Sequence, residues 1–138
     1  MRQFILFTIL VILSLVLVAC GGGDGDTSGE SAGQDLVAQG EELYKGPTIG
    51  SASSPGCVTC HSLEEGVTLV GPSHAGVGAR AGTLVVGMSA EDYLRESILE
   101  PNAHIVDGFS PGVMYQNYAN ELTTDEVDAL VAYMLNLQ

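Results

Sequence analysis

The chain has 138 residues, a length that suits one domain with appended segments rather than two domains. It carries 4 Lys and Arg residues against 17 Asp and Glu residues, which gives a formal net charge of -13. This balance excludes nucleic acid as a partner, because Lys and Arg must neutralise the phosphates of any nucleic acid that a protein binds.

The N-terminal segment is typical of an export signal. Arg2 supplies a positive charge, and the run from Phe4 to Val18 is almost entirely apolar but shorter than the ~20 residues of a spanning helix. Its end, Leu17-Val18-Ala19-Cys20-Gly21, resembles a bacterial lipobox, whose cysteine receives a diacylglycerol. We therefore predict a lipoprotein signal peptide over residues 1–19 and a lipid anchor on Cys20. An uncleaved anchor is the alternative.

Both interpretations put the rest of the chain outside the cytoplasm, and we expect it on the outer face of the bacterial cytoplasmic membrane. Residues 20–33 are predicted to form a tether, since this Gly-, Ser- and Asp-rich stretch has nothing to bury. Residues 34–138 are predicted to form the folded domain, with a first helix from about Gln34 to Tyr44. A tether of this composition reaches roughly 20 Å and would let the domain turn near the membrane.

The segment Cys57-Val58-Thr59-Cys60-His61 is the strongest chemical signal. A thioredoxin-type pair should follow a strand, whereas a Gly-, Ser- and Pro-rich loop over residues 46–56 precedes this one. A zinc site needs further ligands, and His74 and His104 lack the usual paired spacing. A histidine directly after CxxC is instead typical of covalent c-type haem attachment.

The spacing explains that chemistry. Two thiols three positions apart on one helical turn can form thioethers with the two vinyl groups of haem, and the adjacent imidazole of His61 can then ligate the iron. Haem would also fill a thin core, since Phe109 and the 5 tyrosines are the aromatic residues outside the N-terminal segment. We therefore expect one covalently attached haem c.

Helix signals follow in the second half of the chain. A short helix is expected around the haem motif, and another from about Ala90 to Leu99, which Pro101 ends. The last helix should begin after Thr123, with Glu126 completing a capping box, and run to about Leu137. The β-like run over residues 83–86 is too short to found a sheet, so we predict an all-α fold.

The sixth iron ligand is expected to be Met114. Met134 falls on the apolar face of the last helix, and Met88 precedes Ser89-Ala90-Glu91-Asp92, a helix start like a capping box, where it can pack locally. His74 and His104 lie in predicted loops and are interpreted as exposed. Met114 also lies in a loop between two predicted helices, from which its thioether can approach a haem. Ligation by His and Met suits electron transfer.

These features occur in an order that resembles class I cytochrome c over residues 34–138. The segment around Gly40 resembles the family's N-terminal helix, whose glycine permits a close crossing with the C-terminal helix near an aromatic residue, here Tyr133. The resemblance implies an all-α cytochrome c fold, with helices wrapped around the haem. The stretch from Ile98 to Met114 resembles the one that leads to the family's ligand methionine.

The resemblance also implies two further cofactor-binding residues. Gly71-Pro72 resembles the loop whose proline carbonyl accepts a hydrogen bond from the proximal histidine, and Gly78-Ala79-Arg80 resembles the stretch whose arginine contacts a haem propionate. The chain departs from the family at two points. Tyr115 stands where a proline usually follows the ligand methionine, and the loop over residues 46–56 is longer than usual.

The function expected from these signals is one-electron transfer in a respiratory or photosynthetic chain, without an enzymatic activity of its own. The excess of acidic residues favours redox partners with basic docking surfaces. Lipoprotein cytochromes of this type also resemble a subunit of quinol-oxidising complexes, so a fixed subunit is an alternative to a tethered shuttle. A haem-based gas sensor or peroxidase, and thiol redox or metal delivery through Cys57 and Cys60, are the competing classes.

Overall fold

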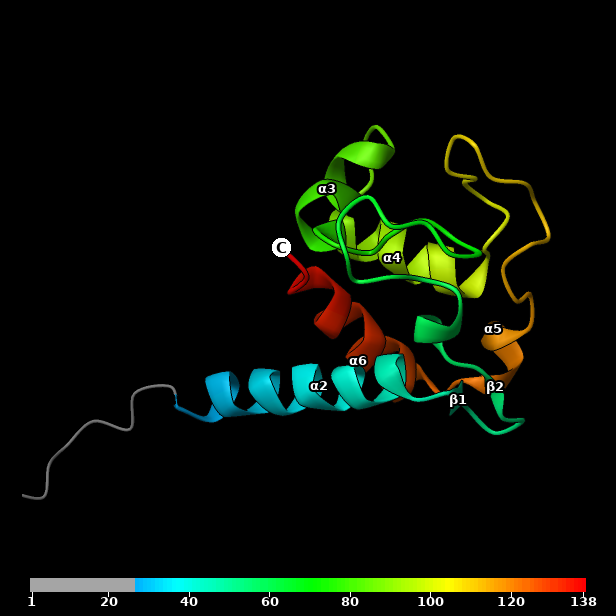
Figure 1. The fold of residues 1–138 in the computed structure, drawn as a ribbon. Helices are drawn as coiled ribbons and strands as arrows, with labels where there is room; N and C mark the ends of the chain where they lie inside the picture. Colours follow the sequence, from blue (N-terminus) through cyan, green and yellow to red (C-terminus); the bar gives the residue numbers. More distant parts are fainter. Residues whose placement is uncertain (1–26) are drawn as a thin grey trace, which may run out of the picture. The chain divides into compact units, whose positions relative to one another are not determined.

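The computed structural model describes residues 27–138, and this part of the chain is mostly helical (Figure 1). Its compact unit covers residues 31–138. The elements in chain order are α2 (Thr27–Lys45), β1 (Thr48–Ile49), β2 (Ser54–Pro55), η1 (Cys57–Thr59), α3 (Val77–Leu84), α4 (Ala90–Leu99), α5 (Tyr118–Glu121) and α6 (Thr124–Leu135). The predicted all-α fold is confirmed. The predicted signal peptide and Cys20 lie outside the described residues.

Helix α2 is longer than the sequence predicted. It begins at Thr27 rather than near Gln34, so residues 27–33 are helical where a tether was expected. Once the packed part of a helix has formed, adding a residue costs only the ordering of that residue, so a helix can extend beyond its buried face. Within residues 27–138 no helix is both long enough and apolar enough to cross a bilayer.

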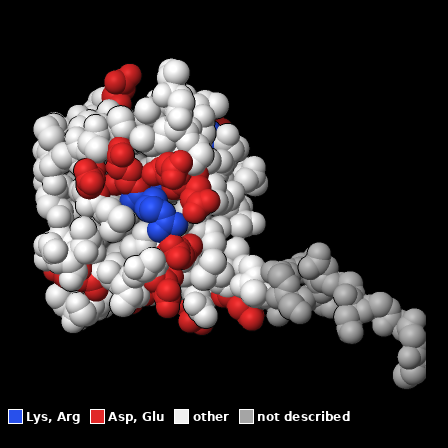
Figure 2. All heavy atoms as spheres, turned by 180° about the vertical axis from the view of Figure 1, so that it is seen from behind, with Lys and Arg blue, Asp and Glu red and all other residues white. Residues whose placement is uncertain are grey.

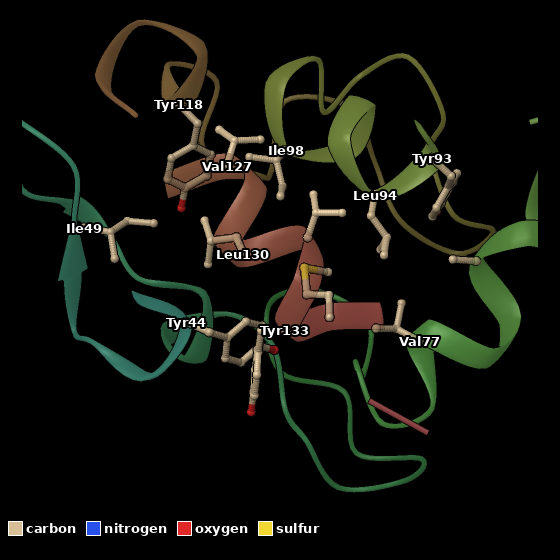
Figure 3. Close-up of a cluster of buried hydrophobic side chains, with 13 residues drawn as sticks. Tyr44, Ile49, Val77, Tyr93, Leu94, Ile98, Tyr118, Val127, Leu130 and Tyr133 are labelled. Atoms are coloured by element: carbon tan, nitrogen blue, oxygen red, sulfur yellow. The ribbon is translucent and has the colours of Figure 1, made fainter. Parts of the chain in front are cut away.

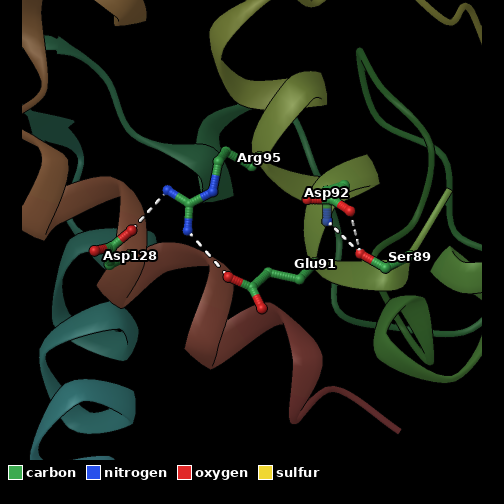
Figure 4. Close-up of polar contacts among 5 residues, drawn as sticks. All are labelled: Ser89, Glu91, Asp92, Arg95 and Asp128. Atoms are coloured by element: carbon green, nitrogen blue, oxygen red, sulfur yellow. Dashed lines mark hydrogen bonds and ion pairs between the residues drawn. The ribbon is translucent and has the colours of Figure 1, made fainter.

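The predicted helix starts at Ser89 and Thr123 are confirmed. The Ser89 hydroxyl accepts a hydrogen bond from the Asp92 backbone N–H at 3.0 Å, as Figure 4 shows, and α4 keeps its predicted bounds. Thr123 and Glu126 form a complete capping box at the start of α6. This helix ends at Leu135, two residues early, because the N–H groups of Asn136 and Leu137 bond three residues back.

The sequence did not predict helices α3 and α5. Helix α3 contains Gly78 and Gly82, which lower its intrinsic stability, and its last residues were interpreted as a β-like run. It is held instead by packing, since Val77 and Ala81 are buried. A two-residue hairpin of β1 and β2, with Ile49 paired to Ser54, forms inside the loop over residues 46–56 and is too short to detect from sequence.

Helix α6 supplies the centre of the hydrophobic core (Figure 3). Its buried side chains meet residues of α3, α4 and α5 and Tyr44 of α2; the core members on α6 are Val127, Leu130, Val131, Tyr133 and Met134. Met134 is 4% exposed, which confirms its predicted place in the core. Outside the core, Arg95 of α4 bonds Asp128 of α6 at 2.6 Å and Glu91 at 3.2 Å (Figure 4).

The crossing of α2 and α6 depends on Gly40, as the sequence predicted. A Cβ atom built on Gly40 would overlap the carbonyl of Ala129 and come within 2.7 Å of the Cβ of Tyr133. The two helix backbones therefore touch at this point, and their approach leaves no room for a side chain.

We predict that Gly40→Ala destabilises the domain by about 1–3 kcal/mol, because the added methyl group must push the two helices apart. Gly33→Ala in the same helix is the matched control, since nothing lies within 4 Å of its Cβ position. The control should be stabilising by about 0.5–1 kcal/mol through helix propensity. Thermal unfolding of both variants measures the difference, and equal stabilities of Gly40→Ala and wild type would contradict this account of the crossing.

Candidate functional site

One cavity of about 290 Å³ brings together most of the predicted site residues. Its lining comes from β2, η1, the four helices α3 to α6 and the loops between them. Cys57, Cys60, His61, Pro72 and Met114 all contribute to this lining. None of the lining residues is Asp, Glu, Lys or Arg, so the cavity is uncharged apart from its histidines.

Cys57 lies on the 3₁₀ turn η1 and Cys60 is its C-cap, and no disulfide joins the two. The Cys57 carbonyl accepts hydrogen bonds from the N–H groups of Cys60 and His61, at 3.1 and 2.9 Å, which fixes the turn. Burial raises the pKa of the Cys57 thiol to about 12. Catalytic thiols have lowered pKa values, so this environment disfavours thiol–disulfide chemistry.

The His61 imidazole is oriented by Pro72. Its Nδ1 lies 2.9 Å from the Pro72 carbonyl oxygen, and because a carbonyl only accepts, Nδ1 must carry the proton. The lone pair of the ring therefore sits on Nε2, the atom left for a metal. Burial also lowers the pKa of His61, which favours the neutral ring that ligation needs.

Gly71 completes the support of this ring. A Cβ atom on Gly71 would come within 2.8 Å of Nδ1 of His61, so the backbone of the loop lies directly against the imidazole. The hydrogen bond that the resemblance implied is thus present, and the residue before the proline is small because the ring occupies the space of a side chain.

His74 is not the exposed loop residue that the sequence suggested. Its ring stacks on His61 with centroids 3.9 Å apart and an interplanar angle of 19°. Its Nδ1 lies 2.9 Å from the hydroxyl of Tyr44, whose side chain is fully buried in α2. Burial, the nearby His61 and the Arg80 charge lower the pKa of His74 to about 3, so the ring is neutral and one hydrogen bond joins it to the tyrosine hydroxyl.

The remaining candidates are distributed as follows. His104 is 38% exposed, lines the cavity and lies 2.9 Å from a Glu96 carboxylate oxygen. Met114 is half-buried in the cavity wall, whereas Met88 packs against the hydrophobic core and does not line the cavity. Of the loop methionines, Met114 is therefore the one that shares a cavity with His61.

Arg80 lies outside the cavity lining. Its guanidinium donates hydrogen bonds to the backbone carbonyls of Ser73 and Ala75 and so braces the loop that carries Pro72 and His74. The two carbonyls therefore occupy guanidinium N–H donors that the resemblance assigned to a haem propionate.

The sequence did not reveal that residues of α4 and α5 line the cavity. Helix α4 contributes Tyr93, Leu94, Ser97 and Ile98, and α5 contributes Tyr118, whose hydroxyl donates to the Pro55 carbonyl at 2.5 Å. The spacing of the α4 residues by three and four was a usable signal, since it marks one helix face. Two thiols, a neutral imidazole, a thioether and an apolar wall form a donor set that fits covalently bound haem.

We predict that Tyr44→Phe destabilises the protein by about 1–3 kcal/mol, because it leaves Nδ1 of the half-buried His74 ring without its hydrogen-bond partner. Tyr133→Phe is the matched control, since Tyr133 packs against Tyr44 with ring centroids 5.2 Å apart and is equally part of the core. Thermal unfolding should separate the two variants. Equal losses from both would show that the Tyr44 hydroxyl contributes nothing beyond packing.

A model of the Cytochrome c family matches residues 37–138 of the chain. No curated protein matches the chain. The matched region covers η1, the cavity and the crossing of α2 with α6. The chain therefore belongs to the cytochrome c family, as a class I c-type cytochrome and haem-based electron carrier with one covalently attached haem c.

Proposed function

We propose that this protein is a membrane-tethered, one-electron carrier of a respiratory or photosynthetic chain. The observation that carries this proposal is the arrangement of His61 and Met114 in the wall of one uncharged cavity. When bound there, the haem supplies the one-electron chemistry, and the chain's residues determine how it is held.

Each site residue has a proposed role. Cys57 and Cys60 would hold the haem through thioethers, and the His61 nitrogen and the Met114 sulfur would ligate its iron. The Pro72 carbonyl accepts a hydrogen bond from the protonated Nδ1 of His61 and so keeps the lone pair on Nε2 available. These roles need no substrate site, because electron transfer changes no bond of a second molecule.

A contact between Arg80 and a propionate stays a prediction. It requires the guanidinium to share or release the carbonyls of Ser73 and Ala75, to which it bonds in the structure. Arg80 also contributes by holding the loop of Pro72 in place, a role that does not depend on that contact.

We further propose that Cys20 carries a lipid and that the domain works on the outer face of the cytoplasmic membrane. The lipobox-like sequence supports the anchor, and membership of the cytochrome c family suggests an extracytoplasmic location in bacteria. A tethered shuttle and a fixed subunit of a quinol-oxidising complex are both compatible with this anchor. The helical residues 27–33 shorten the part of the tether that can be flexible.

Partners with basic docking surfaces fit the charge of the molecule. Figure 2 shows acidic side chains gathered around a basic group on one face, in keeping with the formal net charge of -13. Such a surface attracts a positively charged partner over a distance of about one Debye length, roughly 8–10 Å in physiological salt.

We expect ferric wild-type holoprotein, made with a haem c maturation system, to show a low-spin six-coordinate spectrum with the weak far-red band of methionine–iron ligation. Met114→Ala should abolish this band and lower the reduction potential, because the thioether ligand is lost. Met88→Ala, which removes a methionine that does not line the cavity, is the control and should keep the band.

Persistence of the band in Met114→Ala would show that the sixth ligand lies elsewhere. A high-spin wild type that binds carbon monoxide rapidly and completely when reduced would instead favour a gas sensor or peroxidase.

The lipid anchor has its own test. Intact mass of the protein purified from membranes should correspond to a chain that begins at Cys20 and carries lipid, and Cys20→Ser should lack the lipid mass. A wild-type chain with a free, alkylatable Cys20 thiol would contradict the proposal.

A further inference from the structure

We propose that Asn102 and Gln116 form a clasp that closes the loop carrying Met114 and positions its sulfur for ligation. The inference rests on the proposed role of Met114 as an axial ligand. Neither the Asn102 nor the Gln116 side chain is itself a proposed ligand.

The loop over residues 101–117 contains neither helix nor strand. Its apolar side chains Ile105, Val106 and Val113 line the cavity. Gly112, two residues before Met114, has a φ of +78°, a conformation that side chains other than glycine rarely adopt. Since the apolar contacts of the loop are made toward the cavity, the course of its backbone around Met114 needs further constraints.

Three hydrogen bonds supply those constraints. The Asn102 side-chain oxygen accepts from the Gly112 backbone N–H at 2.7 Å, and the Asn102 amide nitrogen donates to the Gln116 side-chain oxygen at 2.5 Å. The Gln116 amide nitrogen donates in turn to the backbone carbonyl of Met114 at 2.6 Å. Asn102 at the start of the loop is thus tied to both sides of Met114.

Tyr115, the residue that follows Met114, is anchored separately. Tyr115 packs its ring against Tyr118 with centroids 5.0 Å apart, and its hydroxyl donates to Glu121 at 2.8 Å. This contact fixes the chain after Met114 to α5, whereas the clasp joins Gly112 and Gln116 to Asn102. The methionine backbone is therefore held from two directions, by two sets of residues that share no atom.

The clasp has a thermodynamic consequence for ligand exchange. An external ligand can reach the sixth position only when the loop opens, so its apparent affinity is reduced by the stability of the closed loop. Removing hydrogen bonds that exist only in the closed loop should raise that affinity. A tenfold change in this affinity corresponds to about 1.4 kcal/mol, which is within the usual free-energy contribution of one hydrogen bond.

The test is a titration of ferric holoprotein with imidazole, followed by the loss of the far-red methionine–iron band. Asn102→Ala and Gln116→Ala should each bind imidazole about tenfold more tightly than wild type. The double variant should gain much less than a hundredfold in imidazole affinity, because both residues act through the same chain of hydrogen bonds. Asn120→Ala, which removes an exposed asparagine bonded to Asn117, is the control and should match wild type.

Thermal unfolding of the same variants separates positioning from general stability. Lower unfolding temperatures with unchanged imidazole affinity would reduce the two residues to structural ones and overturn the proposal, as would affinities within twofold of wild type. Met114→Ala is carried through the same titration. If it keeps the far-red band, the ligand assignment itself fails; if it loses the band and the clasp variants bind imidazole like wild type, the assignment stands and the clasp fails.

Discussion

The hydrogen bond between Nδ1 of His61 and the Pro72 carbonyl is the interaction on which the rest of the site depends. It fixes the tautomer of a buried imidazole and leaves Nε2 as the free lone pair in an uncharged cavity. The loop that supplies the carbonyl is in turn supported by Arg80, and the imidazole is supported by the stacked ring of His74. The proximal side is therefore a preorganised unit that includes residues from α2 to α3.

That unit needs a rigid frame, which the crossing of α2 and α6 provides. Gly40 brings the two helices into backbone contact, and this contact sets the position of Tyr44, the hydrogen-bond partner of His74. The part of the cavity wall that carries Met114 is different, because Met114 lies in a loop without regular structure that polar side chains hold. A rigid support around His61 and a hydrogen-bonded loop around Met114 would give the two proposed iron ligands different mechanical support.

The sequence predicted the features that are local in the chain. The haem motif, the caps at Ser89 and Thr123 and the Gly40 crossing rest on residues a few positions apart or on the family resemblance, and the structure contains these caps and this crossing. The hydrogen bond of His74 could not be predicted, because its partner Tyr44 lies 30 residues away. Helix α3 escaped prediction because tertiary packing outweighs its glycines, and Arg80 bonds to carbonyls that only the folded loop brings near it.

The most direct test of the central claim is the intact mass of the purified mature protein, combined with alkylation of its thiols. The account predicts the mass of one haem added to the chain and no alkylatable thiol at Cys57 or Cys60, since both sulfurs form thioethers. A chain without haem mass, in which both thiols react after export and maturation, would contradict it.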